Sequence, residues 1–219
     1  MTKIPPSVIK EAVRLLGAQN DNTFAAELEH AYKLLLAASK PRNIYHRVPA
    51  AQTKNGVMLG NTEFASNDLK KLLTHSDTAF LLAVTLGAEI DALIRRLSVT
   101  DMTLATLTDV CANAETERVC DLLEKKLFEE IGPDKYLTRR FSPGYGDLPL
   151  KYSSVLVNVL NTQKHIGLSI TSADMLTPVK SVTAIIGVSS ERENRFRRCD
   201  ECAADKNCVW QKRGERCGL

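Results

Sequence analysis

The sequence lacks any long uninterrupted apolar segment. Its most apolar stretch, Ala79 to Ile94, contains Glu89 and Asp91, and it is shorter than the roughly 20 apolar residues that a membrane-spanning helix needs. The N-terminal residues, MTKIPPSVIKEAVRLLG, hold no apolar run followed by a small-residue cleavage site, so they do not predict a signal peptide. We therefore expect a cytoplasmic protein without a membrane partner.

A strong charge of one sign is missing as well. The 29 Lys and Arg residues are nearly balanced by 26 Asp and Glu residues, which leaves a net charge of +3. This small excess does not indicate nucleic-acid binding. Hydrophobic residues make up 44% and charged residues 25% of the 219 residues, which is ordinary for a soluble globular protein that can bury a sizeable core.

The sequence has no internal repeats, and its predicted helices and strands do not follow a regular βαβ order. The predicted helices cover residues 9–17, 23–39, 67–73, 88–97, 101–130 and 150–165. The predicted extended segments cover residues 41–65, 79–85, 136–140, 167–171 and 181–189. Asn67 or Asp68 is the expected N-cap of the third helix. This order predicts an α+β fold, a twisted antiparallel β-sheet flanked by helices.

The long helix predicted over residues 101–130 carries apolar residues at three- and four-residue steps, which define one face. These residues are Leu104, Leu107, Val110 or Cys111, and Ala114. The same rhythm continues to Glu117, so we expect Glu117 to point toward the buried side of the helix and Glu115 to point elsewhere. A buried carboxylate needs a cation or hydrogen-bond donors. Glu117 is therefore expected either to meet an arginine of the fold or to bind a cationic, amino-bearing ligand.

The segment RRFSPGYGDLPL, residues 139–150, holds two prolines and two glycines, which exclude a helix. Arg140 offers a planar fork for a carboxylate. Gly144 allows a backbone to approach a ligand closely, and Tyr145 supplies a flat face with a polar tip. Considered alone, these residues fit a rigid structural corner as well as a ligand-binding loop.

Three spaced elements give this loop a context. They are an arginine followed by Pro-Gly-Tyr at Arg140, Pro143, Gly144 and Tyr145, a proline and a serine at Pro178 and Ser181, and an aspartate and a glutamate at Asp109 and Glu117. In order and spacing, over about residues 79–190, the sequence resembles the activation domain of cobalamin-dependent methionine synthase, in particular its free-standing bacterial version. The first 70 residues are less similar to that domain.

The resemblance implies a domain that binds S-adenosylmethionine and caps the corrin while oxidised cobalamin is reduced and remethylated. By this resemblance Glu117 meets the amino or sulfonium charge of the ligand, and Arg140 holds its carboxylate. The Pro143–Tyr145 turn supplies backbone contacts and packing. The cleft is lined from a neighbouring strand by Thr177, Pro178 and Ser181.

Three departures from the family pattern accompany the resemblance. Gly146 and Asp147 follow the tyrosine where the full-length enzyme continues with another proline. Lys180 stands where that enzyme has a small residue, and it is a candidate for facing a cobalamin phosphate or side-chain amide. A later ligand-contacting tyrosine of the full-length enzyme has no counterpart here.

The corrinoid-binding signature Asp-x-His-x-x-Gly is absent from the sequence. Cobalamin is therefore expected on a partner, a cobalamin-binding methionine synthase or another corrinoid protein, on which this chain acts in trans. The cobalt would perform the chemistry, so the chain is not expected to be catalytic alone. The alternatives are a non-catalytic corrinoid-protein accessory that does not use S-adenosylmethionine, and an interaction module in which the loop is only a corner.

The cysteines divide into two groups. Cys111 and Cys120 lie within the long helix and are expected to be small buried hydrophobes. Residues 191–219 form a charged linker and a C-x2-C-x5-C-x8-C tail, distinct from the domain predicted over residues 1–190. The tail cysteines, which are expected to bind a metal as zinc or an iron–sulfur cluster, or else to form disulfides or stay free, are Cys199, Cys202, Cys208 and Cys217. The arginines of the linker are either solvated or a docking patch for a flavodoxin-like electron donor.

Overall fold

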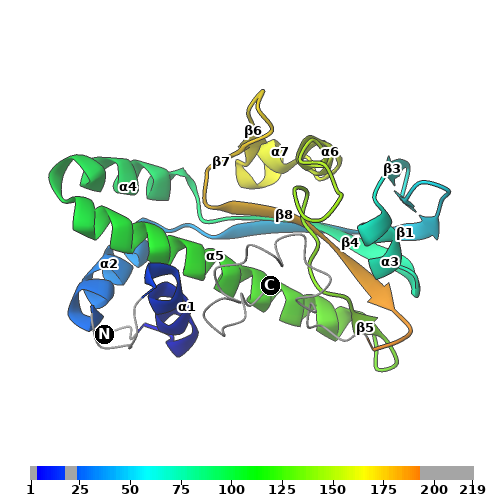
Figure 1. Ribbon diagram of the computed structural model, residues 1–219, viewed down its shortest axis with the longest axis horizontal. Helices are drawn as coiled ribbons and strands as arrows, with labels where there is room; N and C mark the ends of the chain where they lie inside the picture. Colours follow the sequence, from blue (N-terminus) through cyan, green and yellow to red (C-terminus); the bar gives the residue numbers. More distant parts are fainter. Residues whose placement is uncertain (1–3, 18–23, 193–219) are drawn as a thin grey trace. The chain divides into compact units, whose positions relative to one another are not determined.

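The computed structural model describes residues 4–17 and 24–192 (Figure 1). The chain folds into two compact units, each assembled from three segments. Unit 1 comprises Met1–His46, Leu81–Glu130 and Ser153–Ala184, and unit 2 comprises Arg47–Phe80, Ile131–Tyr152 and Ile185–Leu219. In the described part of the chain, no helix is both long and apolar enough to cross a membrane.

Unit 1 holds most of the helices. They are α1 (Pro6–Leu16), α2 (Ala25–Ala38), α4 (Ala88–Thr100), α5 (Met102–Glu130), nearly all of α6 (Tyr152–Val159) and α7 (Thr162–Ile166). A short hairpin pairs β6 (Ser169–Ile170) with β7 (Leu176–Thr177). Helices α1, α2 and α4 pack on α5. Figure 1 shows α1, α2 and α5 on one side of the strands of this unit, and α6 and α7 on the other side.

The helix ends follow from the local sequence. Helix α1 begins at Pro6, whose missing N–H costs nothing at this position. It ends at Gly17, which has φ 66° and returns its N–H to the carbonyls of Arg14 and Val13. Before α5, the side chain of Asp101 accepts a hydrogen bond of 2.9 Å from the N–H of Leu104, as an N-cap residue does. The predicted start and end of this long helix are therefore confirmed.

The predicted apolar face of α5 is buried at Leu107, Cys111 and Ala114, but its continuation to Glu117 is wrong. Glu117 is exposed, whereas Glu115 is only 1% exposed. The buried stripe of the helix includes Ala105, Thr108, Ala112, Glu115, Val119, Leu123 and Leu127. This stripe also advances by three- and four-residue steps, but it contains a threonine and a glutamate. The buried surface of α5 is therefore wider than the predicted face, and a search for apolar residues alone does not find Glu115 within it.

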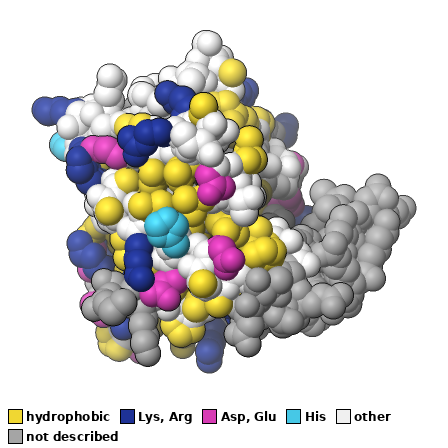
Figure 2. All heavy atoms as spheres, turned by 90° about the vertical axis from the view of Figure 1, so that its left-hand side faces the viewer, with side chains coloured by type: hydrophobic (Ala, Val, Ile, Leu, Met, Phe, Trp, Pro, Cys, Tyr) yellow, Lys and Arg dark blue, Asp and Glu magenta, His cyan; other side chains and the backbone are white. Residues whose placement is uncertain are grey.

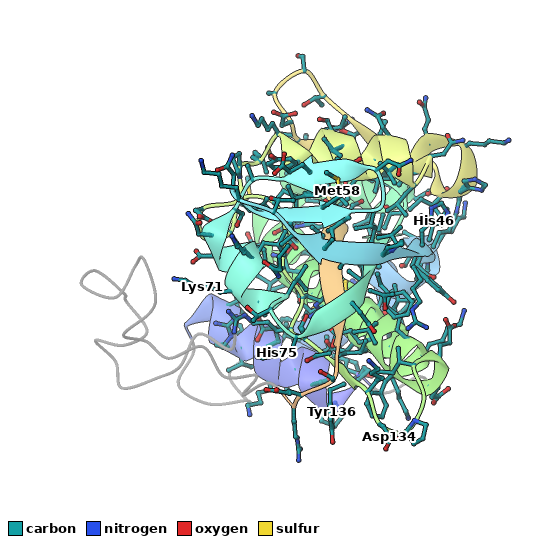
Figure 3. All side chains as sticks on the ribbon, turned by 90° about the vertical axis from the view of Figure 1, so that its right-hand side faces the viewer. His46, Met58, Lys71, His75, Asp134 and Tyr136 are labelled. Atoms are coloured by element: carbon teal, nitrogen blue, oxygen red, sulfur yellow. The ribbon has the colours of Figure 1, made fainter. Side chains whose placement is uncertain are left out.

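Unit 2 contains a six-stranded sheet in the order β3-β2-β1-β4-β8-β5. Its strands are β1 (Arg42–Gln52), β2 (Val57–Leu59), β3 (Thr62–Phe64), β4 (Ser76–Thr85), β5 (Tyr136–Leu137) and β8 (Ser181–Ser189). Strands β1, β4 and β8 continue into unit 1. The pairs β1–β2, β2–β3 and β5–β8 are antiparallel, with Ala51 of β1 opposite Met58 of β2. Figure 3 shows Met58 on the β2–β3 hairpin and His75 just before β4. The expected α+β fold with an antiparallel sheet and flanking helices is confirmed.

Three local predictions change in detail. The helix expected over residues 150–165 is divided into α6 and α7, because Asn161 adopts a left-handed conformation with φ 48°. The strand expected over residues 136–140 is shorter, and Phe141 forms an isolated antiparallel bridge with Ile185. The N-cap of α3 (Asn67–Leu72) is Ser66, whose hydroxyl oxygen accepts from the N–H of Leu69.

One end of unit 1 leaves apolar side chains at the surface where α4 turns into α5. Figure 2 looks onto this end and shows hydrophobic side chains gathered between charged ones. Val99 and Met102, which flank the turn, are 85% and 65% exposed. The buried core of unit 1 includes the face that α2 packs on α5, where Leu28, Ala31 and Leu35 of α2 are almost completely covered.

Candidate functional site

The loop at residues 139–150 lies in unit 2 and is held by its own backbone. The N–H of Gly144 donates to the carbonyl of Leu148 at 2.8 Å, and the N–H of Tyr145 donates to the carbonyl of Ser142 at 3.1 Å. The N–H of Leu148 returns to the carbonyl of Tyr145 at 3.0 Å. Gly144 has φ 93°, a conformation that a residue with a side chain rarely adopts. The loop is therefore two interlocked turns with a defined shape.

The predicted site residues of this loop are not equally accessible. Pro143 is buried, and Arg140 is half-buried. Gly144 is exposed, and the side chain of Tyr145 is 42% exposed. Next to Arg140, Phe141 exchanges two backbone hydrogen bonds of 2.9 Å with Ile185 of β8. The entry to the loop is thus tied to the sheet of unit 2, while its tip presents a glycine backbone and a tyrosine ring.

Asp147 ties the other side of the loop to the start of α3. One carboxylate oxygen accepts from the N–H of Asn67 at 2.7 Å. The other accepts from the hydroxyl of Ser66 and from the N–H of Asp68, the latter at 3.2 Å. Partial burial raises the pKa of Asp147, but these hydrogen bonds outweigh burial and hold the pKa below its ordinary value. Sequence reasoning noted Gly146 and Asp147 only as departures from a family pattern.

Unit 1 contributes the segment from Thr177 to Ser181. Thr177 is exposed and Pro178, which follows a cis peptide bond, is buried. The hydroxyl oxygen of Ser181 lies 2.7 Å from the carbonyl oxygen of Pro178 and 2.8 Å from Oγ1 of Thr85. Ser181 is therefore engaged within the fold, and Thr177 is the more accessible side chain of the two.

Lys180, the candidate for facing a cobalamin group, directs its charge to side chains of α5. The residue is 9% exposed, and its ammonium lies 2.7 Å from Oδ1 of Asp109 on α5. It also donates to the side-chain oxygen of Asn113 at 2.7 Å. A buried ammonium requires such partners. The N–H of Val179 donates to Asp91 of α4 at 2.8 Å, so residues 179–180 are held by both helices.

The buried carboxylate of α5 is Glu115, and it is satisfied within unit 1. Its Oε2 accepts from the hydroxyl of Tyr32 at 3.0 Å and from Nε of Arg118 at 2.7 Å. Its Oε1 accepts from Nη2 of Arg118, also at 2.7 Å. Burial, followed by the Glu115 carboxylate, raises the pKa of Tyr32 to about 12. The expectation of a carboxylate neutralised by an arginine thus applies to Glu115, and Glu117 is left as an exposed acid on the same helix.

Unit 1 also contains a cleft of about 390 Å³, within the size range of small-molecule sites. It is lined by Arg42, Gly87, Ala88, Glu89, Ala92, Ile166, Gly167 and Pro178. Glu89 forms an ion pair with Lys40, which lowers its pKa through the hydrogen bond and the charge of the ammonium. Of the residues predicted for the site, Pro178 lines this cleft. Glu117, Thr177 and Ser181 are not among its described lining residues.

The predicted site residues belong to different units. Glu117, Thr177, Pro178 and Ser181 belong to unit 1, and Arg140, Pro143, Gly144 and Tyr145 belong to unit 2. The four cysteines of the tail lie outside the described residues. Within residues 4–17 and 24–192, no group of His, Cys, Asp and Glu side chains could hold a metal ion. The prediction for Cys111 and Cys120 is confirmed, since both are buried.

Comparisons with known proteins agree with the spaced elements of the sequence. The family model described as "Vitamin B12 dependent methionine synthase, activation domain" matches residues 52–215, which is 164 of the 219 residues. This match includes Arg140–Tyr145, Glu117 and Thr177–Ser181. No match was found among curated protein sequences.

A solved structure described as "Crystal Structure of the MetH Reactivation Domain bound to AdoHcy" is similar in fold. The two chains are 16% identical with a TM-score of 0.57, and the match covers 92% of this chain and 76% of the other. At this identity the likeness concerns the arrangement of helices and strands.

Proposed function

Since the chain belongs to the activation-domain family of vitamin B12-dependent methionine synthase, we propose that it binds S-adenosylmethionine and acts in trans on a cobalamin-binding methionine synthase. The observation that carries the proposal is the ordered turn at Pro143–Tyr145, which presents a bare backbone at Gly144 and an exposed tyrosine ring. A structure of a reactivation domain bound to AdoHcy, similar in fold, supports the ligand class.

The residues fit a zwitterionic ligand with a sulfonium or thioether centre. Glu117, an exposed acid on α5, meets the cationic amino or sulfonium group. Arg140 holds the ligand carboxylate, because a guanidinium matches the geometry of two carboxylate oxygens. Tyr145 packs on an apolar part of the ligand. The backbone carbonyls of Pro143 and Gly144 accept hydrogen bonds from the ligand, because Pro143 has no N–H and the N–H of Gly144 donates to Leu148. The family resemblance assigns Thr177, Pro178 and Ser181 to ligand binding as well.

The chemistry itself belongs to the cobalamin, which the partner holds. S-adenosylmethionine supplies the methyl group when it is bound, and a separate donor, for which a flavodoxin-like protein is a candidate, supplies the electron. The chain contributes position and charge, which are the usual contributions of a protein to cofactor chemistry. It is therefore not catalytic alone, and its effect depends on the corrinoid partner.

Calorimetric titration with S-adenosylmethionine and S-adenosylhomocysteine tests the ligand assignment. Glu117→Gln and Arg140→Ala should each weaken binding about ten-fold or more, since each removes a hydrogen bond to a charged group worth roughly 1.5–3 kcal/mol. Glu129→Gln is a matched control, because Glu129 is also an exposed acid on α5, and it should leave binding unchanged. Absence of binding by the wild-type protein, or equal binding by all variants, would contradict the proposal.

A second candidate function is that of a corrinoid-protein accessory that does not use S-adenosylmethionine. It is favoured by the ion pair between Lys180 and Asp109. Asp109 is one of the two acids, Asp109 and Glu117, of the family pattern, and its carboxylate is already paired with a cation of the protein. Mixing the protein with cobalamin-loaded methionine synthase separates the two functions. Complex formation without any response to S-adenosylmethionine would support the accessory role.

We further propose that the tail at residues 191–219 binds a metal through Cys199, Cys202, Cys208 and Cys217. Thiolates two residues apart, as at Cys199 and Cys202, suit a tetrahedral ion. Metal analysis of the purified full chain, with a visible absorption spectrum, separates colourless zinc from a coloured iron–sulfur cluster. A metal content that does not fall when Cys199 and Cys202 are both replaced by Ser would refute this assignment.

A further inference from the structure

We propose that Asp147 is a positioning residue for ligand binding, which fixes the Pro143–Tyr145 turn against the start of α3. This inference rests on the proposed function, because the turn is assigned there to S-adenosylmethionine. Asp147 directs both of its carboxylate oxygens to Ser66, Asn67 and Asp68. It lies two residues after Tyr145, so its fixation limits where the tyrosine ring can be.

The contact is more than a cap for α3. That helix already has an N-cap, because Oγ of Ser66 accepts from the N–H of Leu69 at 3.0 Å. Asp147 adds a second set of acceptors that comes from 80 residues away in the sequence. The N–H groups of Asn67 and Asp68 belong to the first turn of the helix, where no intrahelical acceptor exists for them. The anchor therefore satisfies donors that the local sequence leaves open.

The backbone beside Asp147 is shaped to reach these donors. Gly146 has φ 53°, and a Cβ added to it would lie 2.3 Å from Oδ2 of Asp68. The loop backbone thus lies against the side chain of Asp68, which would have to move if Gly146 carried a Cβ. On the other side of the tyrosine, Gly144 has φ 93°. Tyr145 is held between two left-handed glycines and a carboxylate anchor.

Because Asp147 is exposed, its effect on the position of the loop can be measured separately from its effect on the stability of the fold. Asp147 is exposed, and exposed charge interactions contribute little to global stability. Its removal should loosen the loop without unfolding unit 2, whose sheet is built from other residues. The functional consequence is a loss of preorganisation, since the free energy of ordering the turn is then subtracted from the free energy of binding.

Amide hydrogen exchange and ligand affinity, measured on the full chain, test this role together. In Asp147→Ala, protection of the Gly144, Tyr145 and Leu148 amides should fall at least ten-fold, while protection in β2 and the unfolding midpoint stay near the wild-type values. The dissociation constant for S-adenosylhomocysteine should rise about ten-fold. Asp147→Asn should lie between wild type and Asp147→Ala in both quantities, because its single carbonyl oxygen still accepts.

Asp77→Asn is the matched control in unit 2. It removes an exposed carboxylate whose ion pair, 3.3 Å from Nζ of Lys135, does not involve the loop, so neither exchange nor affinity should change. Unchanged loop protection in Asp147→Ala would overturn the anchor. Lost protection with unchanged affinity would overturn the positioning role. If the wild-type protein itself does not bind, the proposed function fails and the positioning role fails with it, and the exchange data still show whether the anchor exists.

Discussion

Replacement of Glu115 by Ala removes the one carboxylate that α5 buries in the described part of unit 1. Glu115 accepts three hydrogen bonds, one from Tyr32 and two from Arg118. The substitution leaves the hydroxyl of Tyr32, a residue that is 2% exposed, without this acceptor. It also leaves the guanidinium of Arg118 without its carboxylate. The helix itself is not weakened, because alanine is the best helix former.

The expected cost follows from the burial of each partner. Breaking a buried ion pair by removal of one partner typically costs about 3–5 kcal/mol. The side chain of Arg118 is 32% exposed and can regain water, so we expect the lower end, about 3 kcal/mol. Glu115→Gln keeps the shape and one acceptor oxygen, and should cost about 1–2 kcal/mol. Glu117→Ala, two positions along the same helix, is exposed and should stay within about 0.5 kcal/mol of wild type.

Urea unfolding followed by circular dichroism measures these differences. With a denaturant slope of about 3 kcal/mol/M, a loss of 3 kcal/mol lowers the midpoint by about 1 M. The urea midpoints should be highest and equal for wild type and Glu117→Ala, lower for Glu115→Gln, and lowest for Glu115→Ala. Equal midpoints for the two alanine variants, or a lower midpoint for Glu117→Ala, would refute the assignment of Glu115 as the buried acid.

Three further predictions concern pH, charge and packing. The pKa of Tyr32 is raised from 10.0 to about 12. Its contribution to the free energy of unfolding should therefore be fully present below pH 10 and be lost as pH rises toward 12. In urea unfolding between pH 9 and 11.5, the free energy of unfolding should decline less steeply with pH in Tyr32→Phe than in wild type, and parallel declines would contradict this. Asp109→Ala should cost about 2–4 kcal/mol, because it removes the carboxylate partner of the Lys180 ammonium, whose side chain is 10% exposed. Lys180→Met should cost less, because the side chain of Asp109 is 43% exposed and can hydrate. A lower melting temperature for Lys180→Met than for Asp109→Ala would be inconsistent with Lys180 as the buried partner. Gly187→Ala should cost about 1–3 kcal/mol, since its Cβ would lie 2.4 Å from Cδ2 of Leu73 and 2.5 Å from Oγ of Ser76; a wild-type melting temperature would show that the strand has room for a methyl group.

Much of the fold can be predicted from the sequence alone, because helices and strands depend on local residue patterns. Asp101 marks the start of α5 by capping it, and Gly17 marks the end of α1 by adopting a left-handed conformation. The alternation of β1 and the apolar run of β4 were both readable as strands. The Pro-Gly-Tyr turn and its spacing from Glu117 and Ser181 were equally readable, since spacing is a property of the chain.

Only the tertiary structure decided which acid of α5 is buried and what the departures from the family pattern do. Glu115 is buried because Tyr32 and Arg118 reach it, and Tyr32 is 83 residues away in the sequence. Lys180 is buried because Asp109 and Asn113 of α5 bind its ammonium. Asp147 is an anchor because α3, 80 residues earlier, turns open N–H groups toward it. In each case a polar side chain is placed by a distant partner, and hydrophobic periodicity carries no information about such partners.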